Sequence, residues 1–325
     1  MTEIFLTVFF ISVLLFFLGS GIWVALSMIG VSAIGMMFFT SRPVGDAMAT
    51  TIWGTSSSWT LTALPLFVWM GEILFRTKLS ENLFRGLSPW MQKLPGGLIH
   101  VNVVGCALFA AISGSSAATV ATVGKMSIPE LRKRKYPEKI LLGSLAGSGT
   151  LGLLIPPSII LIIYGVAVQE SIAKLFIAGI IPGIMIALIF MSYVIIWSLI
   201  NKKDMPKILE EYSFFEKVKR SKQLLPVIIL IFAVIGSIYT GIATATEAAS
   251  LGVVGALILS YLQKSLTLKT FQSSLLGATK TSCMIAFILA GSTFLSLAMG
   301  FTGLPRNLAV WIQNMELSPY VLIFV

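Results

Sequence analysis

The stretch His100–Tyr164 reads HVNVVGCALFAAISGSSAATVATVGKMSIPELRKRKYPEKILLGSLAGSGTLGLLIPPSIILIIY and indicates the kind of fold. It holds two apolar segments that stop at small residues, first at Ser113–Ser116 and then at Gly147–Thr150, with Pro156 and Pro157 shortly after. Within a bilayer, irregular backbone is tolerated only where it is buried in protein or lines a watery cavity, because each unsatisfied amide costs several kcal/mol. The two breaks therefore predict a polar pocket at membrane depth, built from helix ends as in secondary transporters.

The composition around this stretch is that of a membrane protein. Hydrophobic residues make up 56% of the 325 residues and charged residues only 11%. Successive apolar runs are long enough to span about 30 Å of hydrocarbon. We therefore predict an all-α polytopic membrane protein that lies in the lipid bilayer and has no soluble domain.

The positive charge is distributed in a way that favours cytoplasmic loops over nucleic-acid binding. The net charge is +10, but Lys and Arg fall mainly in short segments between apolar runs and form no folded basic domain. Cytoplasmic loops of membrane proteins carry such an excess. The segments Glu130–Lys139 and Asn201–Gln223 are therefore predicted to lie in the cytoplasm. Cys106 and Cys283 both lie in apolar runs, which favours free buried thiols over a disulfide framework.

The apolar runs predict an order of segments along the chain. Segments too short to cross, on either side of Ser113–Ser116, favour a re-entrant hairpin at about 98–128. A Lys-bearing amphipathic piece is expected up to Lys280, followed by a span from Cys283 to about Gly300. The predicted divisions are N-terminal scaffold spans with an interfacial arm (1–60), a first repeat with the hairpin and a broken span at 140–168 (61–200), a basic loop (201–222), scaffold spans and an arm (223–282), and the start of an inverted second repeat (283–325).

An internal repeat supports this division. LFRGLSPWMQ (83–92) aligns without gaps with LPRNLAVWIQ (304–313), sharing Leu, Arg, Leu, Trp and Gln. The predicted spans before the two copies run in opposite directions, so the repeats are inverted and the substrate site should lie at their interface. The same offset places the end of the second repeat near residue 421, so we expect the natural protein to extend by roughly a hundred residues, with a second hairpin.

Several segments together resemble one transporter family. They are SGSSAATVATVG, KRKYPEK, GSGTLGLLIPPSIILIIYG, LFIAGIIPG and TGIATATEAASLGVVGAL. They resemble the large membrane subunit of tripartite ATP-independent periplasmic (TRAP) transporters over essentially the whole chain. Two departures are Ala245, where family members often have Pro, and the family's continuation well past Val325.

The resemblance implies an elevator-type carrier in the bacterial cytoplasmic (inner) membrane, coupled to sodium ions and importing a small organic acid of the sialic acid or C4-dicarboxylate type. It also implies two partners, a small four-span membrane subunit and a periplasmic substrate-binding protein. No GxxxxGK[ST] loop is present, so ATP is not expected as an energy source, and no organic cofactor is expected. No metal site other than sodium is predicted.

The motif matches place the predicted ligands at the two breaks. Hydroxyls and the free carbonyls of broken helices suit sodium, while the amides of a helix N-terminus favour a carboxylate. An arginine can pair with a substrate carboxylate through two hydrogen bonds. The predicted sodium ligands are Ser113, Gly114, Ser116, Gly147, Thr150 and Pro156, and the predicted substrate contacts are Ser115, Ser116, Thr119 and Arg306.

Plainer explanations compete with several of these predictions. Small residues also permit close helix packing, which is the preferred explanation for the pair Gly143 and Gly147 but not for the two clustered breaks. Arg306 has its repeat equivalent in Arg85 on a predicted amphipathic helix, which favours interface anchoring for both. Glu247 is either a proton relay or a helix cap.

Two other function classes compete with a carrier. A non-transporting scaffold subunit or a channel could share the fold, but a scaffold has no reason to keep broken helices with unsatisfied backbone. A membrane enzyme is a distant third, because no nucleophile with a base and no metal cluster lies in the predicted spans. The lone His100 lacks neighbouring metal ligands, and an interfacial position is expected for it.

Overall fold

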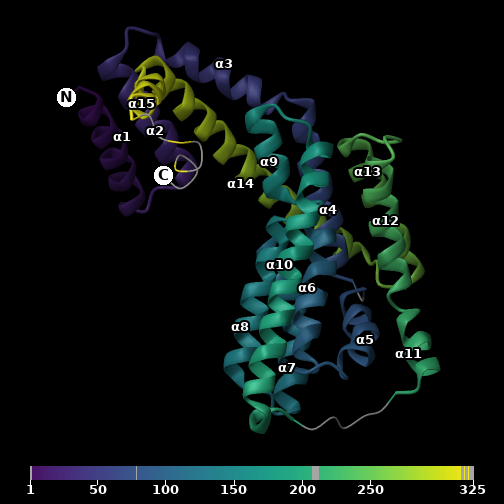
Figure 1. Ribbon diagram of the computed structural model, residues 1–325. Helices are drawn as coiled ribbons and strands as arrows, with labels where there is room; N and C mark the ends of the chain where they lie inside the picture. Colours follow the sequence, from purple (N-terminus) through teal and green to yellow (C-terminus); the bar gives the residue numbers. More distant parts are fainter. Residues whose placement is uncertain (1, 78, 207–211, 316–317, 319–320, 322–325) are drawn as a thin grey trace. The chain divides into compact units, whose positions relative to one another are not determined.

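The computed structural model describes all residues except 1, 78, 207–211, 316–317, 319–320 and 322–325. The described residues form helices and no strand, which confirms the predicted all-α class (Figure 1). The chain divides into two compact units, one formed by Trp59–Ser282 and the other by Met1–Ser58 together with Cys283–Val325.

The unit formed by the two chain ends has a small apolar core. It contains α1 (Thr2–Gly19), α2 (Val24–Phe39), α3 (Val44–Ser56), the second half of α14 (Leu268–Phe301) and α15 (Leu304–Gln313). Met36, Phe294 and Ala298 are buried together in this unit. The turn between α1 and α2 includes Gly21, whose φ of +80° is a left-handed conformation that glycine adopts without steric cost.

The larger unit contains the stretch quoted above. Its helices are α4 (Ala63–Phe75), α5 (Leu79–Met91), α6 (Ile99–Ser113), α7 (Ser116–Lys133), α8 (Glu138–Gly149), α9 (Ile159–Val168), α10 (Ile172–Ile200), α11 (Phe214–Ser221), α12 (Leu225–Tyr239), α13 (Ala245–Leu262) and the first half of α14, with 3-10 turns at Trp59–Thr62 (η1), Thr150–Leu153 (η2) and Lys202–Asp204 (η3).

Helix α14 corrects one prediction. The sequence predicted an amphipathic piece ending at Lys280 and a separate span from Cys283, but α14 runs without a break from Leu268 to Phe301. Residues 280–283 (KTSC) include neither Gly nor Pro to end a helix. The polar first half is accommodated by packing, since Trp69 of α4 donates a 3.3 Å hydrogen bond to Ser274 and stacks edge-on against Phe271.

Helix lengths separate spanning from non-spanning segments. Among the described residues, three helices, α10, α13 and α14, are long and apolar enough to cross a membrane, or up to five segments if each bent pair counts as one. Four apolar helices in the same residues are shorter, including α6 with 15 residues and α9 with 10. At 1.5 Å per residue these two reach only about 22 Å and 15 Å, less than the roughly 30 Å of a hydrocarbon core. Neither crosses the bilayer alone.

Helix α6 lies at the centre of the larger unit. It packs on α4, α7, α8 and α10, and most of its residues are buried. Val103 and Ala110 of α6 are buried together with Leu151 of η2. On the other side, Phe67 of α4 meets Phe176 of α10 edge-on at 6.0 Å. The first predicted break, at the end of α6, and the second, at the end of α8, therefore both adjoin this central helix.

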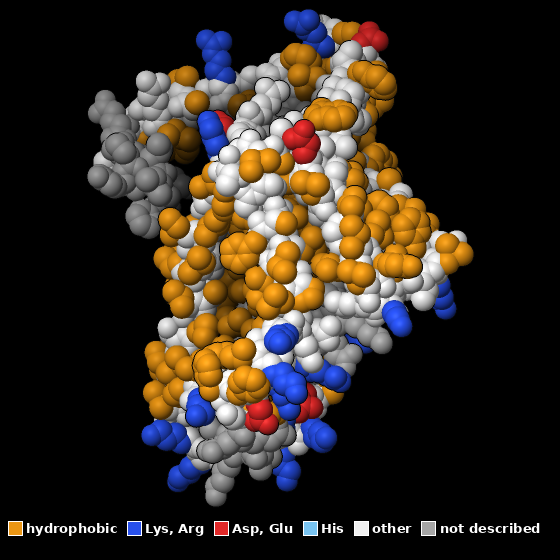
Figure 2. All heavy atoms as spheres, turned by 90° about the vertical axis from the view of Figure 1, so that its right-hand side faces the viewer, with side chains coloured by type: hydrophobic (Ala, Val, Ile, Leu, Met, Phe, Trp, Pro, Cys, Tyr) orange, Lys and Arg blue, Asp and Glu red, His pale blue; other side chains and the backbone are white. Residues whose placement is uncertain are grey.

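The surface is apolar along the helices and basic at one end. Figure 2 shows hydrophobic side chains along the exposed flanks, with Lys and Arg most numerous toward the bottom of the view and a few more at the top. On α10, Ile181 is 77% exposed. An exposed apolar helix surface of this kind suits contact with lipid rather than water.

The basic loop between α7 and α8 is ordered by specific contacts. Arg132 binds Glu138 with an Nε–Oε1 distance of 2.6 Å, and Arg134 binds Glu130 at 2.8 Å. The Tyr136 hydroxyl accepts a 3.1 Å hydrogen bond from the amide of Leu98, just before α6. Burial raises the pKa of Tyr136. Tyr136 thereby ties the loop to the base of the hairpin.

Candidate functional site

The first break is a tight turn between two antiparallel helices. Helix α6 ends at Ser113, and Gly114 follows with φ of +58° and an amide that still donates to the Ala110 carbonyl at 3.0 Å. Ser115 is the N-cap of α7, and its hydroxyl accepts from the Ala118 amide at 3.4 Å. The glycine supplies the left-handed conformation and the serine satisfies an orphan amide. This is the hairpin that the Ser113–Ser116 pattern predicts.

A hydroxyl cluster lies inside this tip. The Ser113 hydroxyl is 2.9 Å from that of the fully buried Thr119 and 3.3 Å from the Ser115 carbonyl oxygen. The buried Ser116 hydroxyl has no hydrogen-bond partner among the described residues. A buried polar group without a partner costs free energy, so this oxygen at the tip is available to a ligand.

The second break begins where the sequence predicted it and extends further along the chain. Helix α8 ends at Gly149, within the GSGT sequence, the chain tightens into η2, and irregular backbone follows between Leu154 and Ser158. The Ser148 hydroxyl donates to the Ser144 carbonyl at 2.6 Å, and that of Thr150 donates to the Gly147 carbonyl at 2.7 Å. Hydroxyls that bond back in this way are compatible with a continuing helix, whereas the two prolines lack the amide that helix continuation needs.

The two breaks are in direct contact. The carbonyl of Gly114 accepts a 3.2 Å hydrogen bond from the amide of Ile159, the first residue of α9. A Cβ on Gly114 would lie 2.8 Å from the Pro157 carbonyl oxygen, and a Cβ on Gly152 would lie 3.0 Å from the Ser116 amide nitrogen. Backbone therefore packs on backbone at this junction, which needs residues without side chains.

Three further glycines shape the site, although the sequence reasoning did not select them. A Cβ on Gly71 of α4 would lie 2.8 Å from the Cα of Ser113. On α10, a Cβ on Gly179 would lie 2.7 Å from the Leu154 carbonyl oxygen, and one on Gly183 would lie 2.9 Å from the Ile155 side chain. The sequence could have identified Gly179 and Gly183, because two glycines spaced four residues apart on a membrane helix let backbones approach closely. No comparable sequence pattern identifies Gly71.

The predicted site residues fall into three places. Ser113, Gly114, Ser115, Ser116 and Thr119 form the tip, and the buried Pro156 lies in the break that meets it. Gly147 instead faces Phe190 of α10, with a Cβ-to-ring distance of 3.1 Å, and the Thr150 side chain is exposed.

Arg306 belongs to the other unit, where its side chain is exposed on α15. Its contact with a substrate stays a prediction, as do the sodium roles of the residues above.

Other polar residues have structural partners. Glu247 closes a capping box at the start of α13: its carboxylate accepts from the Thr244 amide at 2.8 Å and its own amide donates to the Thr244 hydroxyl. This confirms a capping role. His100 is fully buried at the start of α6, and its Nε2 lies 2.7 Å from the Pro95 carbonyl oxygen. No group of three or more metal-ligating side chains occurs among the described residues.

The junction offers oxygen atoms and backbone amides rather than acids. Hydroxyls of three residues, the carbonyl at the end of α6 and the irregular backbone before α9 lie within one contact network. Glu72, next to Gly71 on α4, pairs with Arg76 at 2.9 Å instead of reaching the tip. The N-terminus of α7 adds a partial positive charge. Such an arrangement can bind a small cation and the carboxylate of an organic anion.

Apolar helices long enough to cross a bilayer, together with two interrupted helices whose breaks meet, define a multi-pass membrane protein of the secondary-transporter kind. Residues 9–325 match the family model of the tripartite ATP-independent periplasmic transporter, DctM component, and the chain belongs to this family. This confirms the resemblance found in the sequence.

Similar proteins from several bacteria agree with this family assignment. The chain is 33% identical to the C4-dicarboxylate TRAP transporter large permease protein DctM of Pseudomonas aeruginosa, over 90% of this chain and 68% of that protein. It is 32% identical to the sialic acid TRAP transporter large permease protein SiaM of Vibrio cholerae, over 94% and 71%. It is 31% identical to the isethionate TRAP transporter permease protein DctMQ of Oleidesulfovibrio alaskensis, over 90% and 46%. These are permease names, which confirms a transport rather than an enzymatic class.

Proposed function

We propose that this chain is the permease of a sodium-coupled TRAP transporter that imports a small organic acid across the bacterial cytoplasmic membrane. The observation that carries this proposal is the contact between the tip of the α6–α7 hairpin and the break before α9, with the partnerless Ser116 hydroxyl beside it. Interrupted helices are costly in a membrane and are kept where they bind substrate and ions.

Sodium is the coupling ion that this chemistry favours. The tip supplies neutral oxygen atoms from Ser113, Ser116 and Thr119, and no described carboxylate lies in its hydrogen-bond network. Proton coupling needs a titratable group, whereas a hard cation needs several oxygen ligands and no titration. In this proposal, Ser113 and Ser116 hold the ion, with Gly114 and the Pro156 region supplying carbonyl oxygens.

The proposed substrate is an anion with a carboxylate or a similar acidic group. Three relatives are named for C4-dicarboxylates, sialic acid and isethionate, which share a negative charge and differ in shape, and a fourth is named for ectoine, a zwitterion that also carries a carboxylate. The amides at the start of α7, beside Ser115 and Thr119, suit such a group. Arg306 is a second proposed contact, through a bidentate pair.

The proposal includes two partners and an elevator movement. A small membrane subunit and a periplasmic binding protein complete a tripartite transporter, and the name of the fused DctMQ relative is consistent with a small subunit beside the large one. In an elevator, the hairpin and the broken span move together as one body. The backbone hydrogen bond from Ile159 to Gly114 supports such joint movement.

The test is uptake into proteoliposomes that contain the permease with its small subunit, supplied with the binding protein from the same operon. Candidate labelled acids are a C4-dicarboxylate, sialic acid and isethionate. We expect uptake of one class with an inward sodium gradient, and none when a proton gradient replaces it. Robust uptake with sodium absent on both sides would rule out sodium coupling, and a lack of uptake of any organic acid by the complete system would contradict the transport proposal.

A further inference from the structure

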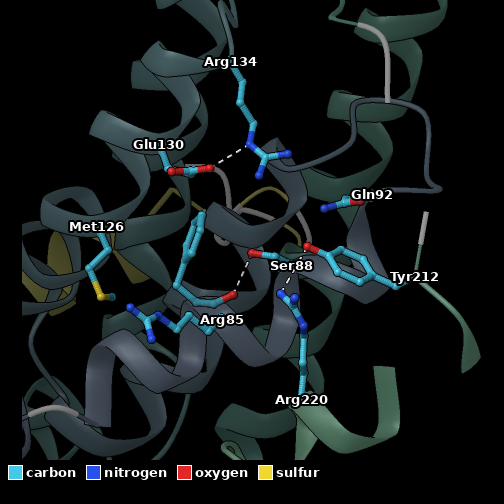
Figure 3. Close-up of a pocket in the computed structure, with 9 residues that line it drawn as sticks. Arg85, Ser88, Gln92, Met126, Glu130, Arg134, Tyr212 and Arg220 are labelled. Atoms are coloured by element: carbon cyan, nitrogen blue, oxygen red, sulfur yellow. Dashed lines mark hydrogen bonds and ion pairs between the residues drawn. The ribbon is translucent and has the colours of Figure 1, made fainter. Parts of the chain in front are cut away.

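Helix α11 is attached to α5 by one of its faces. The Trp90 indole of α5 donates a 2.7 Å hydrogen bond to the Ser221 hydroxyl, and the Lys217 ammonium lies 5.6 Å from the centre of the Trp90 ring. On the same side of α11, Arg220 stacks on the Tyr212 ring at 4.2 Å and donates to its hydroxyl at 3.1 Å. Figure 3 shows this Arg220–Tyr212 pair on the wall of a pocket of about 390 Å³ that α5 and α7 also line. Lys217, Arg220 and Ser221 therefore define the attached face of α11.

The opposite face of α11 is apolar and exposed. Phe214 is 72% exposed and Phe215 is 79% exposed, and Val218, one turn after Phe214, is exposed as well. With 3.6 residues per turn, Phe215 lies about 160° around the helix from Lys217 and about 140° from Arg220. Two neighbouring phenylalanines exposed in this way are unfavourable in water, so this face indicates an apolar surrounding.

The position of α11 along the chain indicates what that surrounding is. Residues 222–224 alone separate α11 from α12, and the two helices meet at 56°. Helix α12 carries no charged residue, and its most exposed apolar side chains, Leu225, Ile229 and Phe232, follow one stripe at helical spacing. An uncharged helix with such a stripe suits contact with lipid. Helix α11 therefore lies at the end of a helix that faces lipid.

The charges beside the apolar face match a membrane surface on the predicted cytoplasmic side. Lys219 lies about 40° around the helix from Phe215, and Lys222 follows directly after the last residue of α11. Both lysines are exposed. The segment 201–223 is predicted to lie in the cytoplasm, and the cytoplasmic leaflet carries anionic lipids. A helix with aromatic side chains on one face and Lys beside them is typical of a helix in the membrane interface.

We propose that the exposed face of α11 lies in the cytoplasmic leaflet of the membrane. Phe214, Phe215 and Val218 lie among the upper acyl chains, and Lys219 and Lys222 pair with the headgroups of anionic phospholipids. A lipid surface accounts for this face better than a soluble protein does, because α11 lies at the end of a helix that faces lipid. Since α11 is attached to α5, the same contact holds α5 at the membrane surface.

The test places a nitroxide spin label on Phe215→Cys in the full-length permease complex, in a background without other cysteines. The complex is reconstituted in nanodiscs of phosphatidylcholine and phosphatidylglycerol. Molecular oxygen concentrates in hydrocarbon and a neutral nickel chelate stays in water, so the rates at which each collides with the label report its surroundings. We expect frequent collisions with oxygen and few with the nickel chelate. Lys203→Cys, exposed in η3 of the same basic segment, is the reference position and should give the reverse.

Two matched double variants test the role of the charges. Lys219→Gln with Lys222→Gln should raise the rate of nickel collisions at Phe215→Cys at least about two-fold, because basic residues beside an anionic surface strengthen the contact. Lys202→Gln with Lys203→Gln removes the same number of charges from exposed residues outside α11 and should change that rate by less than about 1.5-fold. In nanodiscs of phosphatidylcholine alone, the two double variants should behave alike.

The other outcomes decide against the proposal. Nickel collisions as frequent at Phe215→Cys as at Lys203→Cys would place the face in water and overturn it. Few collisions with either reagent would show that protein covers the face, either another subunit or a second copy of this chain, and would also overturn it. Equal effects of the two double variants in the presence of phosphatidylglycerol would overturn the pairing with anionic lipid.

Discussion

Ser116 and Ser127 lie on the same helix, α7, and both carry a buried hydroxyl without a partner among the described residues. Only Ser116 lies at the hairpin tip, where Gly152 approaches its amide. If the Ser116 hydroxyl is a ligand, Ser116→Ala should raise the sodium concentration for half-maximal uptake several-fold, while stability changes by no more than about 1 kcal/mol. The measurement is uptake at graded sodium concentrations, with surface expression quantified.

Ser127→Ala is the matched control, since it removes the same kind of group from the same helix. We expect wild-type sodium dependence from it. Sodium dependence that is equally altered in both variants, or in neither, would favour a packing role for Ser116.

Gly114 makes a separate prediction about backbone geometry. An alanine there would need φ of +58° and would place its Cβ 2.8 Å from the Pro157 carbonyl oxygen. We expect Gly114→Ala to destabilise the protein by at least about 1 kcal/mol from the left-handed conformation alone, and to abolish uptake. Gly143→Ala has nothing within 4 Å of the new Cβ and lies inside α8, so it should be neutral or stabilising by up to about 1 kcal/mol. Thermal unfolding of both variants checks this, and equal midpoints would count against the tight junction.

At the scale of the helix, the start of α13 allows an experiment to distinguish two roles of Glu247, a proton relay and a helix cap. Glu247 accepts from the Thr244 amide and hydroxyl, both at 2.8 Å. Glutamine can take the same place in a capping box, so Glu247→Gln should keep both stability and the pH profile of uptake. Thr244→Val removes the cap and should cost about 1 kcal/mol. Loss of uptake in Glu247→Gln, with normal stability, would favour a proton-relay role for Glu247 over a purely capping role.

The helices and their breaks also show which features of the structure could be predicted from the sequence. The hairpin was predictable because two short apolar segments met at SGSS, where glycine and serine have local reasons to turn and cap a helix. The second break was predicted at GSGT, where α8 ends, but composition does not reveal that the hydroxyls of Ser148 and Thr150 bond back to their own helix. The contact of Gly114 with Pro157, and of Gly71 with Ser113, depends on tertiary packing that no local pattern encodes.

At the scale of the whole molecule, the distribution of charge predicts which loops face the cytoplasm. The segment 201–223 carries seven Lys and Arg against four acids, and Glu130–Lys139 carries five basic residues. The turn between α12 and α13, at 240–244, carries no charge. Positively charged loops remain in the cytoplasm, and α12 leads from the second basic segment to the uncharged turn, so that turn should face the periplasm.

Single cysteines in a background with Cys106→Ser and Cys283→Ser test this orientation. Ile242 is 81% exposed in the turn, Lys133 is the last residue of α7, and Lys203 lies in η3, just after α10. A membrane-impermeant maleimide added to intact spheroplasts should label Ile242→Cys, and it should label Lys133→Cys and Lys203→Cys only after permeabilisation. Between Lys133 and Lys203 the chain forms α8, the second break, α9 and α10. We expect this segment to cross the bilayer twice, so both positions should be labelled from the same side of the membrane. Labelling of Lys133→Cys and Lys203→Cys from opposite sides would mean that the broken span does not cross the bilayer, and the hairpin could then not share a membrane-depth site with it.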